Sequence, residues 1–129
     1  MTRWTSDELT KIAAADELEI ASLGRVATLR DPTTIWVVRL GDDLYVRSVN
    51  GRTGAWFRGT QVRREGRIRA GGVERDVTLV DADDEINDQI DDAYRDKYRR
   101  YAQSIVGSVL TPEARSATIK LAPRSTNSL

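Results

Sequence analysis

The sequence predicts one α+β domain in which antiparallel hairpins close into a small barrel and helices pack outside it. Two segments carry strong hairpin signals, and a long amphipathic helical pattern follows them. Few helical patterns lie between the expected strands, which favours antiparallel pairing over parallel crossovers. A length of 129 residues fits a single core. We therefore expect one domain over residues 1–122 and a loose tail over 123–129.

The N-terminal part is expected to form a short helix and then extended segments. Ser6 can cap the helix, because apolar residues at helical spacing follow it. Alternating polarity over 18–21 predicts a strand. Gly24 allows a turn, and residues 26–29 resume an extended pattern.

The central segment gives the clearest hairpin. Residues 34–40 are rich in β-branched and aromatic side chains, 41–43 form a tight turn, and 44–49 return as a second strand. Residues 53–61 then predict one short helix capped by Thr53.

A second hairpin is expected over residues 67–80, with a two-glycine turn at 71–72. If these glycines form the loop, two pairs of opposite charge face each other across the strands, and a slip of one residue would lose both pairs. The facing pairs are Arg69 with Glu74, and Arg67 with Asp76.

The C-terminal third predicts a long helix over about 83–106, followed by a turn at 111–113 and a last strand over 117–121. We interpret the tyrosines of this helix as packing residues, because they follow helical spacing. The apolar stripe consists of Ile86, Ile90, Tyr94, Tyr98, Tyr101 and Ile105.

The composition excludes several kinds of chemistry. The chain contains no Cys and no His, which excludes thiolate nucleophiles, catalytic triads with His, and zinc sites built on sulfur or imidazole. Proton transfer would need a carboxylate, Tyr, Lys or water, unless a cofactor carries the reaction. No calcium-loop spacing is present, so we expect no metal site. Without an apolar leader or membrane span in the sequence, we expect a cytoplasmic protein.

The neutral net charge conceals an uneven distribution. Eight arginines and three acids lie between positions 39 and 69, whereas eight acids and no base lie between 76 and 92. Two interpretations stay open: the two regions pair with each other or form solvated faces, or the basic region holds an anion. A net charge of zero argues against a dedicated nucleic-acid partner.

The candidate anion site is the segment 47–58, which runs from a strand end through a glycine-containing loop into a helix start. Free N–H groups and the positive end of the helix dipole would meet there. Arg47 and Arg58 would add bidentate phosphate contacts. Trp56 follows the loop directly and can reach a ligand, whereas Trp36 is either a core residue or a stacking surface.

These motifs also resemble a known family. Over nearly its full length the sequence is similar to the uncharacterised bacterial family called domain of unknown function 2255. The stretches that carry the resemblance are Trp4 with Leu9, 18–20, 34–39, 41–48, 56–58, 66–74, and 93–94 with 97–98.

The family looks like a branch of the FMN-binding split-barrel superfamily, which includes pyridoxamine-phosphate oxidases and deazaflavin-dependent nitroreductases. The resemblance implies a six-stranded split barrel, a homodimer, and an FMN or deazaflavin coenzyme at the subunit interface of a small oxidoreductase. It implies two sets of site residues: Thr34 and Trp36 near the ring, and Arg47, Ser48, Asn50, Trp56 and Arg58 near the phosphate.

Two other functions remain open at this point. One is a cofactor-free binding protein or non-redox enzyme that uses the same cleft for a small anionic or aromatic ligand. The other is a nucleic-acid or protein adaptor that uses the arginine-rich strands, although the neutral net charge disfavours it.

Overall fold

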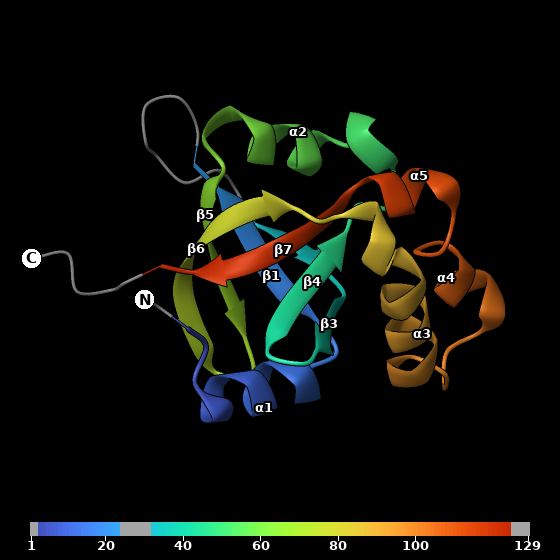
Figure 1. Cartoon of the computed structure of the whole chain (residues 1–129), viewed down its shortest axis with the longest axis horizontal. Helices are drawn as coiled ribbons and strands as arrows, with labels where there is room; N and C mark the ends of the chain where they lie inside the picture. Colours follow the sequence, from blue (N-terminus) through green and yellow to red (C-terminus); the bar gives the residue numbers. More distant parts are fainter. Residues whose placement is uncertain (1–2, 24–31, 125–129) are drawn as a thin grey trace, which may run out of the picture.

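The computed structural model describes residues 3–23 and 32–124, which form an α+β domain with a nearly closed antiparallel barrel and helices outside it (Figure 1). This confirms the predicted fold class, with seven strands in one sheet where about six were expected. The turn expected at Gly24, the extended segment 26–29 and most of the expected tail lie outside the described residues. Residues 123 and 124 are described, and Pro123 ends the last strand.

The order of strands in the sheet is β2-β1-β5-β6-β7-β4-β3, and every neighbouring pair is antiparallel. The two edge strands, β2 and β3, are consecutive in the chain, and Trp36 alone connects them. The strands are β1 (Leu18–Ser22), β2 (Thr33–Ile35), β3 (Val37–Leu40), β4 (Asp43–Arg47), β5 (Glu65–Ala70), β6 (Val73–Asp81) and β7 (Thr118–Pro123).

The prediction of one continuous strand over 34–40 is therefore wrong. The chain pairs with β1 before Trp36 and with β4 after it, so the strand has to break where its partner changes. The hairpin that joins β3 to β4 is confirmed, with Leu40 opposite Asp43.

Helices cover both ends and one side of the barrel. In Figure 1, α1 lies across the lower end, α2 across the upper end, and α3, α4 and α5 lie together at the right. Their bounds are α1 (Ser6–Ala14), α2 (Ala55–Arg63), α3 (Asn87–Lys97), α4 (Gln103–Gly107) and α5 (Pro112–Ser116), with 3-10 turns η1 (Gly51–Thr53) and η2 (Asp84–Ile86). No helix in the described ranges combines the length and apolarity needed to cross a membrane.

Two helix starts differ from the prediction. The cap of α1 is Thr5, not Ser6: its hydroxyl accepts from the Glu8 N–H at 3.0 Å, and the Glu8 carboxylate accepts from the Thr5 N–H at 2.9 Å. The cap of α2 is Gly54 rather than Thr53, because the turn η1 forms first and the Thr53 hydroxyl donates to the Asn50 carbonyl.

The register of the second hairpin is confirmed over β5 and β6, since Arg69 lies opposite Glu74 and Arg67 opposite Asp76. The Arg67 side chain also pairs with Asp76 at 2.8 Å. Arg69 instead reaches the other neighbouring strand and pairs with Glu19 of β1 at 2.5 Å.

The long helix expected over 83–106 is wrong, because α3 ends at Lys97 and α4 begins at Gln103. At the break, side chains bond to the backbone of the sheet: Lys97 Nζ donates to the Val37 carbonyl at 2.6 Å. Ile105, expected in the apolar stripe, is 49% exposed on α4.

The core has two parts. One fills the barrel and includes Phe57 and Ile68, and the other lies between the outer face of β3 and β4 and the helices α3 and α4. Tyr94 and Tyr98 are fully buried in the second cluster, and Tyr101 packs against it. The prediction that these tyrosines are packing residues is confirmed.

Candidate functional site

A cavity of about 280 Å³ lies where β2, the loop after β4, the start of α2 and the helix α4 meet. We call it the tryptophan cavity, because two indole side chains form part of its wall. The residues that line it are Thr34, Ile35, Trp36, Arg47, Val49, Trp56, Ile105, Ser108 and Val109.

The cavity brings together four of the seven site residues expected from the sequence: Thr34, Trp36, Arg47 and Trp56. The other three do not line it. Ser48 is buried at the start of the loop, whereas Asn50 and Arg58 are exposed.

Both indoles are held by protein on one side and remain partly exposed. Trp36 stacks on Tyr98, with ring centroids 3.8 Å apart, and packs against the second core cluster. Trp56 packs against the barrel core and meets Phe57 edge to face at 6.3 Å. Trp36 is thus a packing residue that also forms part of the cavity wall. The core interpretation is confirmed for its packed face, and stacking on a ligand stays a prediction.

The loop between β4 and α2 depends on its glycines. Gly51 has a φ of +69°, and a side chain there would come within 3.1 Å of Glu113 on α5. A side chain at Gly54 would lie 2.7 Å from the Ser48 hydroxyl. The loop is therefore closely packed at both positions, and a side chain at either one would require its neighbours to shift.

The start of α2 has unused hydrogen-bonding capacity. Because Gly54 is its cap, no side chain accepts from the N–H groups of the first turn. The hydroxyl of Ser48 is buried next to Gly54 and has no hydrogen-bond partner among the described residues. Trp56 lies in this first turn, so the uncapped helix start adjoins the tryptophan cavity.

Arg47 has partners that the sequence did not indicate. Its guanidinium is fully buried, forms an ion pair with Asp91, and makes five hydrogen bonds, as many as it has N–H groups. The acceptors are Thr118 Oγ1, Asp91 Oδ1, the Val109 carbonyl, and the carbonyl and Oδ1 of Asn87. A phosphate would have to displace one of them to contact Arg47.

The basic middle and the acidic segment of the sequence do pair with each other. Four ion pairs connect them, which confirms the first interpretation of the charge pattern for these residues. The pairs are Arg47–Asp91, Arg52–Asp81 at 4.0 Å, Arg64–Asp81 at 3.2 Å and Arg67–Asp76 at 2.8 Å. Arg58 makes no ion pair within residues 3–23 and 32–124.

Several lining residues were missed in the sequence. Val49 and Ile105 are 48% and 49% exposed and border the cavity, together with Ser108 and Val109. The helical pattern placed Ile105 in the core, and no local signal indicates that the chain reverses between α3 and α4. These residues could be found only from the fold.

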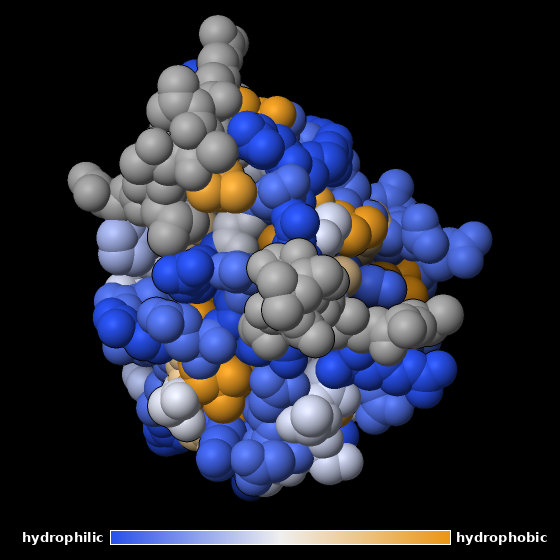
Figure 2. Space-filling model, turned by 90° about the vertical axis from the view of Figure 1, so that its left-hand side faces the viewer, coloured by the Kyte–Doolittle hydropathy of each residue, from blue (hydrophilic) through white to orange (hydrophobic). Residues whose placement is uncertain are grey.

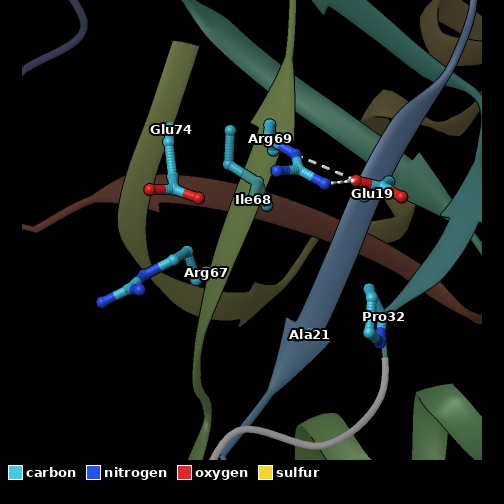
Figure 3. A pocket seen from close by; sticks show the side chains of 7 residues that line it. All are labelled: Glu19, Ala21, Pro32, Arg67, Ile68, Arg69 and Glu74. Carbon is cyan, nitrogen blue, oxygen red and sulfur yellow. Dashed lines mark hydrogen bonds and ion pairs between the residues drawn. The ribbon is translucent and has the colours of Figure 1, made fainter. Parts of the chain in front are cut away.

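Another hollow, of about 250 Å³, lies on the outer face of β1, β5 and β6 (Figure 3). Both of its arginines already have acidic partners, since Arg69 pairs with Glu19 in the lining and Arg67 with Asp76 beside it. The side of the molecule in Figure 2 is mostly hydrophilic, with small separate hydrophobic areas. In the described residues, no group of three or more acidic side chains could hold a metal ion.

Comparison with protein families finds a match over most of the chain. A family described as an uncharacterized protein conserved in bacteria, DUF2255, matches residues 8–121. This confirms the resemblance found in the sequence. A search among curated proteins finds no match.

Solved structures share the fold at low sequence identity. A conserved hypothetical protein from Mycobacterium tuberculosis is similar with a TM-score of 0.67 and 6% identity, covering 97% of this chain and 83% of its own. HutZ, the heme storage protein from Vibrio cholerae, has a TM-score of 0.63 and 13% identity, covering 96% and 92%. An F420 reductase has a TM-score of 0.57 and 10% identity, covering 90% and 92%. These likenesses identify the fold as a split barrel.

Proposed function

The chain belongs to DUF2255, a family of uncharacterised proteins conserved in bacteria, and we propose that it binds FMN or a deazaflavin coenzyme in the tryptophan cavity as a small oxidoreductase. The observation that carries this proposal is the meeting of Trp36, Trp56 and the uncapped start of α2 at one cavity. The coenzyme carries an aromatic ring system and a phosphate. The ring needs an aromatic surface to stack on, and the phosphate needs hydrogen-bond donors next to that surface. The F420 reductase supplies a precedent for a coenzyme of this class on the same fold.

The polar end of the coenzyme would lie at the loop between β4 and α2. The N–H groups of the first turn of α2 and the orphaned Ser48 hydroxyl offer hydrogen bonds that phosphate oxygens would complete. Asn50 lies in this loop and Arg58 lies in α2, and both side chains are exposed. They would add hydrogen bonds to the phosphate from the solvent side. Arg47 would support the loop through its buried contacts instead of contacting the phosphate.

The ring would contact Trp36 and Trp56, beside Thr34. The cavity volume of about 280 Å³ is just below the usual range for small-molecule pockets, about 300–1,000 Å³. Part of the coenzyme would therefore extend past the exposed side chains of Val49 and Ile105. In a homodimer the partner subunit would cover this part.

A bound flavin or deazaflavin would supply hydride transfer. The chain itself would orient the ring through the two indoles, hold the phosphate at the loop and keep water from the ring. Among the described residues of the cavity wall, the charged side chain is Arg47, which keeps its proton, and the hydroxyls are those of Ser108 and Thr34. These residues would bind and position the coenzyme rather than transfer protons.

Heme has less support, although a heme storage protein shares the fold. The sequence contains neither His nor Cys, and its one Met is Met1, so the usual axial ligands are scarce. Burial raises the pKa of the Tyr94 hydroxyl, which disfavours a phenolate ligand there.

A cofactor-free function in the same cavity is the second candidate. It is favoured by Arg47, the cation that the described residues contribute to the cavity wall, because its N–H groups are all occupied. A small aromatic ligand would then bind through the indoles alone.

Absorbance titration of the purified protein with FMN and, in parallel, with a deazaflavin coenzyme tests the proposal. We expect saturable micromolar binding of one of them, weakened at least about tenfold by Trp56→Leu, on the scale of one lost aromatic contact. Val62→Ala changes an exposed residue of the same helix outside the cavity, and it should bind as the original protein does. Folded protein that binds neither coenzyme would overturn the proposal and favour the cofactor-free candidate.

A further inference from the structure

A second hollow, of about 380 Å³, shares the helix α4 with the tryptophan cavity. We call it the arginine hollow. Its lining residues are Arg95, Arg99, Tyr101, Gln103, Val106, Gly107 and Leu110.

The segment 103–110 forms the wall between the two spaces. Residues 105, 108 and 109 line the tryptophan cavity, whereas residues 103, 106, 107 and 110 line the arginine hollow. This alternation follows helical spacing, so the two spaces lie on opposite faces of α4 and the turn that follows it.

The charges of the arginine hollow favour an anion. Its lining includes two arginines and no acid. Arg95 and Arg99 pair with Asp92 and Asp96 at 3.1 and 3.6 Å, and all four side chains are at least 58% exposed. Exposed pairs of this kind contribute little to stability, so an incoming anion can compete for the guanidinium groups.

The floor of the hollow is apolar. Val106, Tyr101 and Leu110 belong to, or pack against, the second core cluster. A Cβ atom at Gly107 would have no other heavy atom within 4 Å, so the space above this residue is open. A ligand that fits both features carries an anionic group on a short apolar body.

We propose that the arginine hollow binds a small organic anion, a carboxylate or monophosphate attached to an aromatic or aliphatic group, and that this binding is coupled to the tryptophan cavity through α4 and Tyr101. The connection through Tyr101 is direct, because the centroid of the Tyr101 ring lies 5.2 Å from that of the Trp36 ring. A ligand that contacts Tyr101 or Val106 therefore changes the packing of Trp36 or of Ile105 across the helix. Any such coupling is reciprocal between the two sites.

The test is a titration with phenyl phosphate followed by two-dimensional amide NMR, with inorganic phosphate as the probe of charge alone. We expect saturable shifts of the amide signals of Gln103, Gly107 and Leu110. Arg95→Gln/Arg99→Gln should weaken binding at least about tenfold. Gly107→Leu should weaken binding to a similar extent, because the leucine side chain would fill the open space above this residue.

Matched controls separate a specific site from general charge attraction. Lys11→Gln/Arg63→Gln removes the same charge from α1 and α2, outside both spaces, and should leave the phenyl phosphate affinity unchanged. Trp56→Leu should still show the Gly107 shift, because Trp56 does not line the arginine hollow. No flavin is used, so the result is independent of whether the proposed coenzyme binds.

The coupling has its own readout in the indole N–H signal of Trp36. We expect phenyl phosphate to shift this signal, and Tyr101→Leu to reduce that shift while the Gly107 shift persists. Shifts confined to the tryptophan cavity, or binding that survives both Arg95→Gln/Arg99→Gln and Gly107→Leu, would overturn the site. An unmoved Trp36 signal at saturation would overturn the coupling.

Discussion

The indole of Trp36 stacks on the ring of Tyr98, with centroids 3.8 Å apart and planes 4° from parallel. Trp36 is the single residue between the two edge strands of the sheet. The Tyr98 hydroxyl accepts from the Val37 N–H at 3.2 Å and donates to the Asp16 carbonyl at 2.6 Å. The stack therefore holds α3 against the split in the barrel and supports one wall of the tryptophan cavity.

Replacing Trp36 with Leu should destabilise the protein by about 1.5–3 kcal/mol, from lost apolar area and the lost ring pair. Urea unfolding measures this change. Trp56→Leu is the matched control, because Trp56 is also half-buried in the cavity wall but has no parallel ring partner. Equal losses in the two variants would show that the stack with Tyr98 adds nothing to the area buried.

The buried Arg47–Asp91 pair should behave as a unit that joins β4 to α3. Arg47→Met leaves Asp91 in a site where only 9% of its side chain is exposed, with Arg115 at 3.5 Å as its remaining partner, and removal of one partner of a buried pair costs about 3–5 kcal/mol. We expect Arg47→Met/Asp91→Leu to lose less than the two single variants together, because both charges of the pair are then absent and Arg115 keeps its ion pair with Asp88. Urea unfolding of all four proteins gives the double-mutant cycle, and additive losses would contradict a coupled pair.

The parts of the fold that were predicted from the sequence rest on local turn chemistry. The Gly71-Gly72 turn predicted the register of β5 and β6, and the turn at Gly41 predicted that β3 and β4 form a hairpin. The breaks at Trp36 and after Lys97 were missed, because they result from contacts with β1, β4 and the Val37 carbonyl that are distant in the sequence. Periodicity alone continues a strand or helix through such a point.

The sequence also indicated only some of the residues that line the candidate site. Thr34, Trp36 and Trp56 meet at one cavity, and their contacts with a coenzyme stay a prediction. The role of Arg47 could not be predicted, since its charged partner Asp91 is 44 residues away on α3. Ile105 was missed because its exposure depends on where α4 packs.

Glu8 should make stability depend on acid pH. Its carboxylate accepts from the Thr5 N–H and pairs with Arg75 at 2.7 Å. Burial raises the pKa of Glu8, but the hydrogen bonds from Thr5 and Arg75 and the charge of Arg75 outweigh it and hold the pKa below the ordinary value of 4.5. The folded pKa is depressed, so this contribution is present above about pH 4.5 and is lost as the pH falls through the folded value.

Glu8→Gln should therefore lower the free energy of unfolding at pH 7 by about 1–2 kcal/mol and flatten its decline below pH 4.5. Urea unfolding from pH 3 to 7 gives both values. Glu17→Gln is the control, because Glu17 is exposed and makes no ion pair within the described ranges. If the two variants have the same acid profile, the contacts of Glu8 contribute no pH dependence.

Lys97 should make stability rise with pH as well, but in the alkaline range. Burial lowers the pKa of its amine to about 8, the charge of Arg100 acts in the same direction, and Asp16 opposes both. Between about pH 8 and 9.5 the folded amine loses its proton while the unfolded amine still holds it. The unfolded state then binds more protons, so the free energy of unfolding from this group rises with pH.

Comparison of the original protein with Lys97→Met over this window isolates the effect, and we expect the variant to lack the rise. The window stops at pH 9.5 because burial raises the pKa of Tyr94 and Tyr98, and tyrosines of the unfolded chain that ionise near pH 10 reverse the slope. Lys11→Met changes an exposed lysine of α1 and should keep the full rise. If the free energy of unfolding of Lys97→Met rises with pH as steeply as that of the original protein, the Lys97 amine keeps its proton through the hydrogen bond to the Val37 carbonyl. Burial beside Tyr98 would then cost the charged amine little.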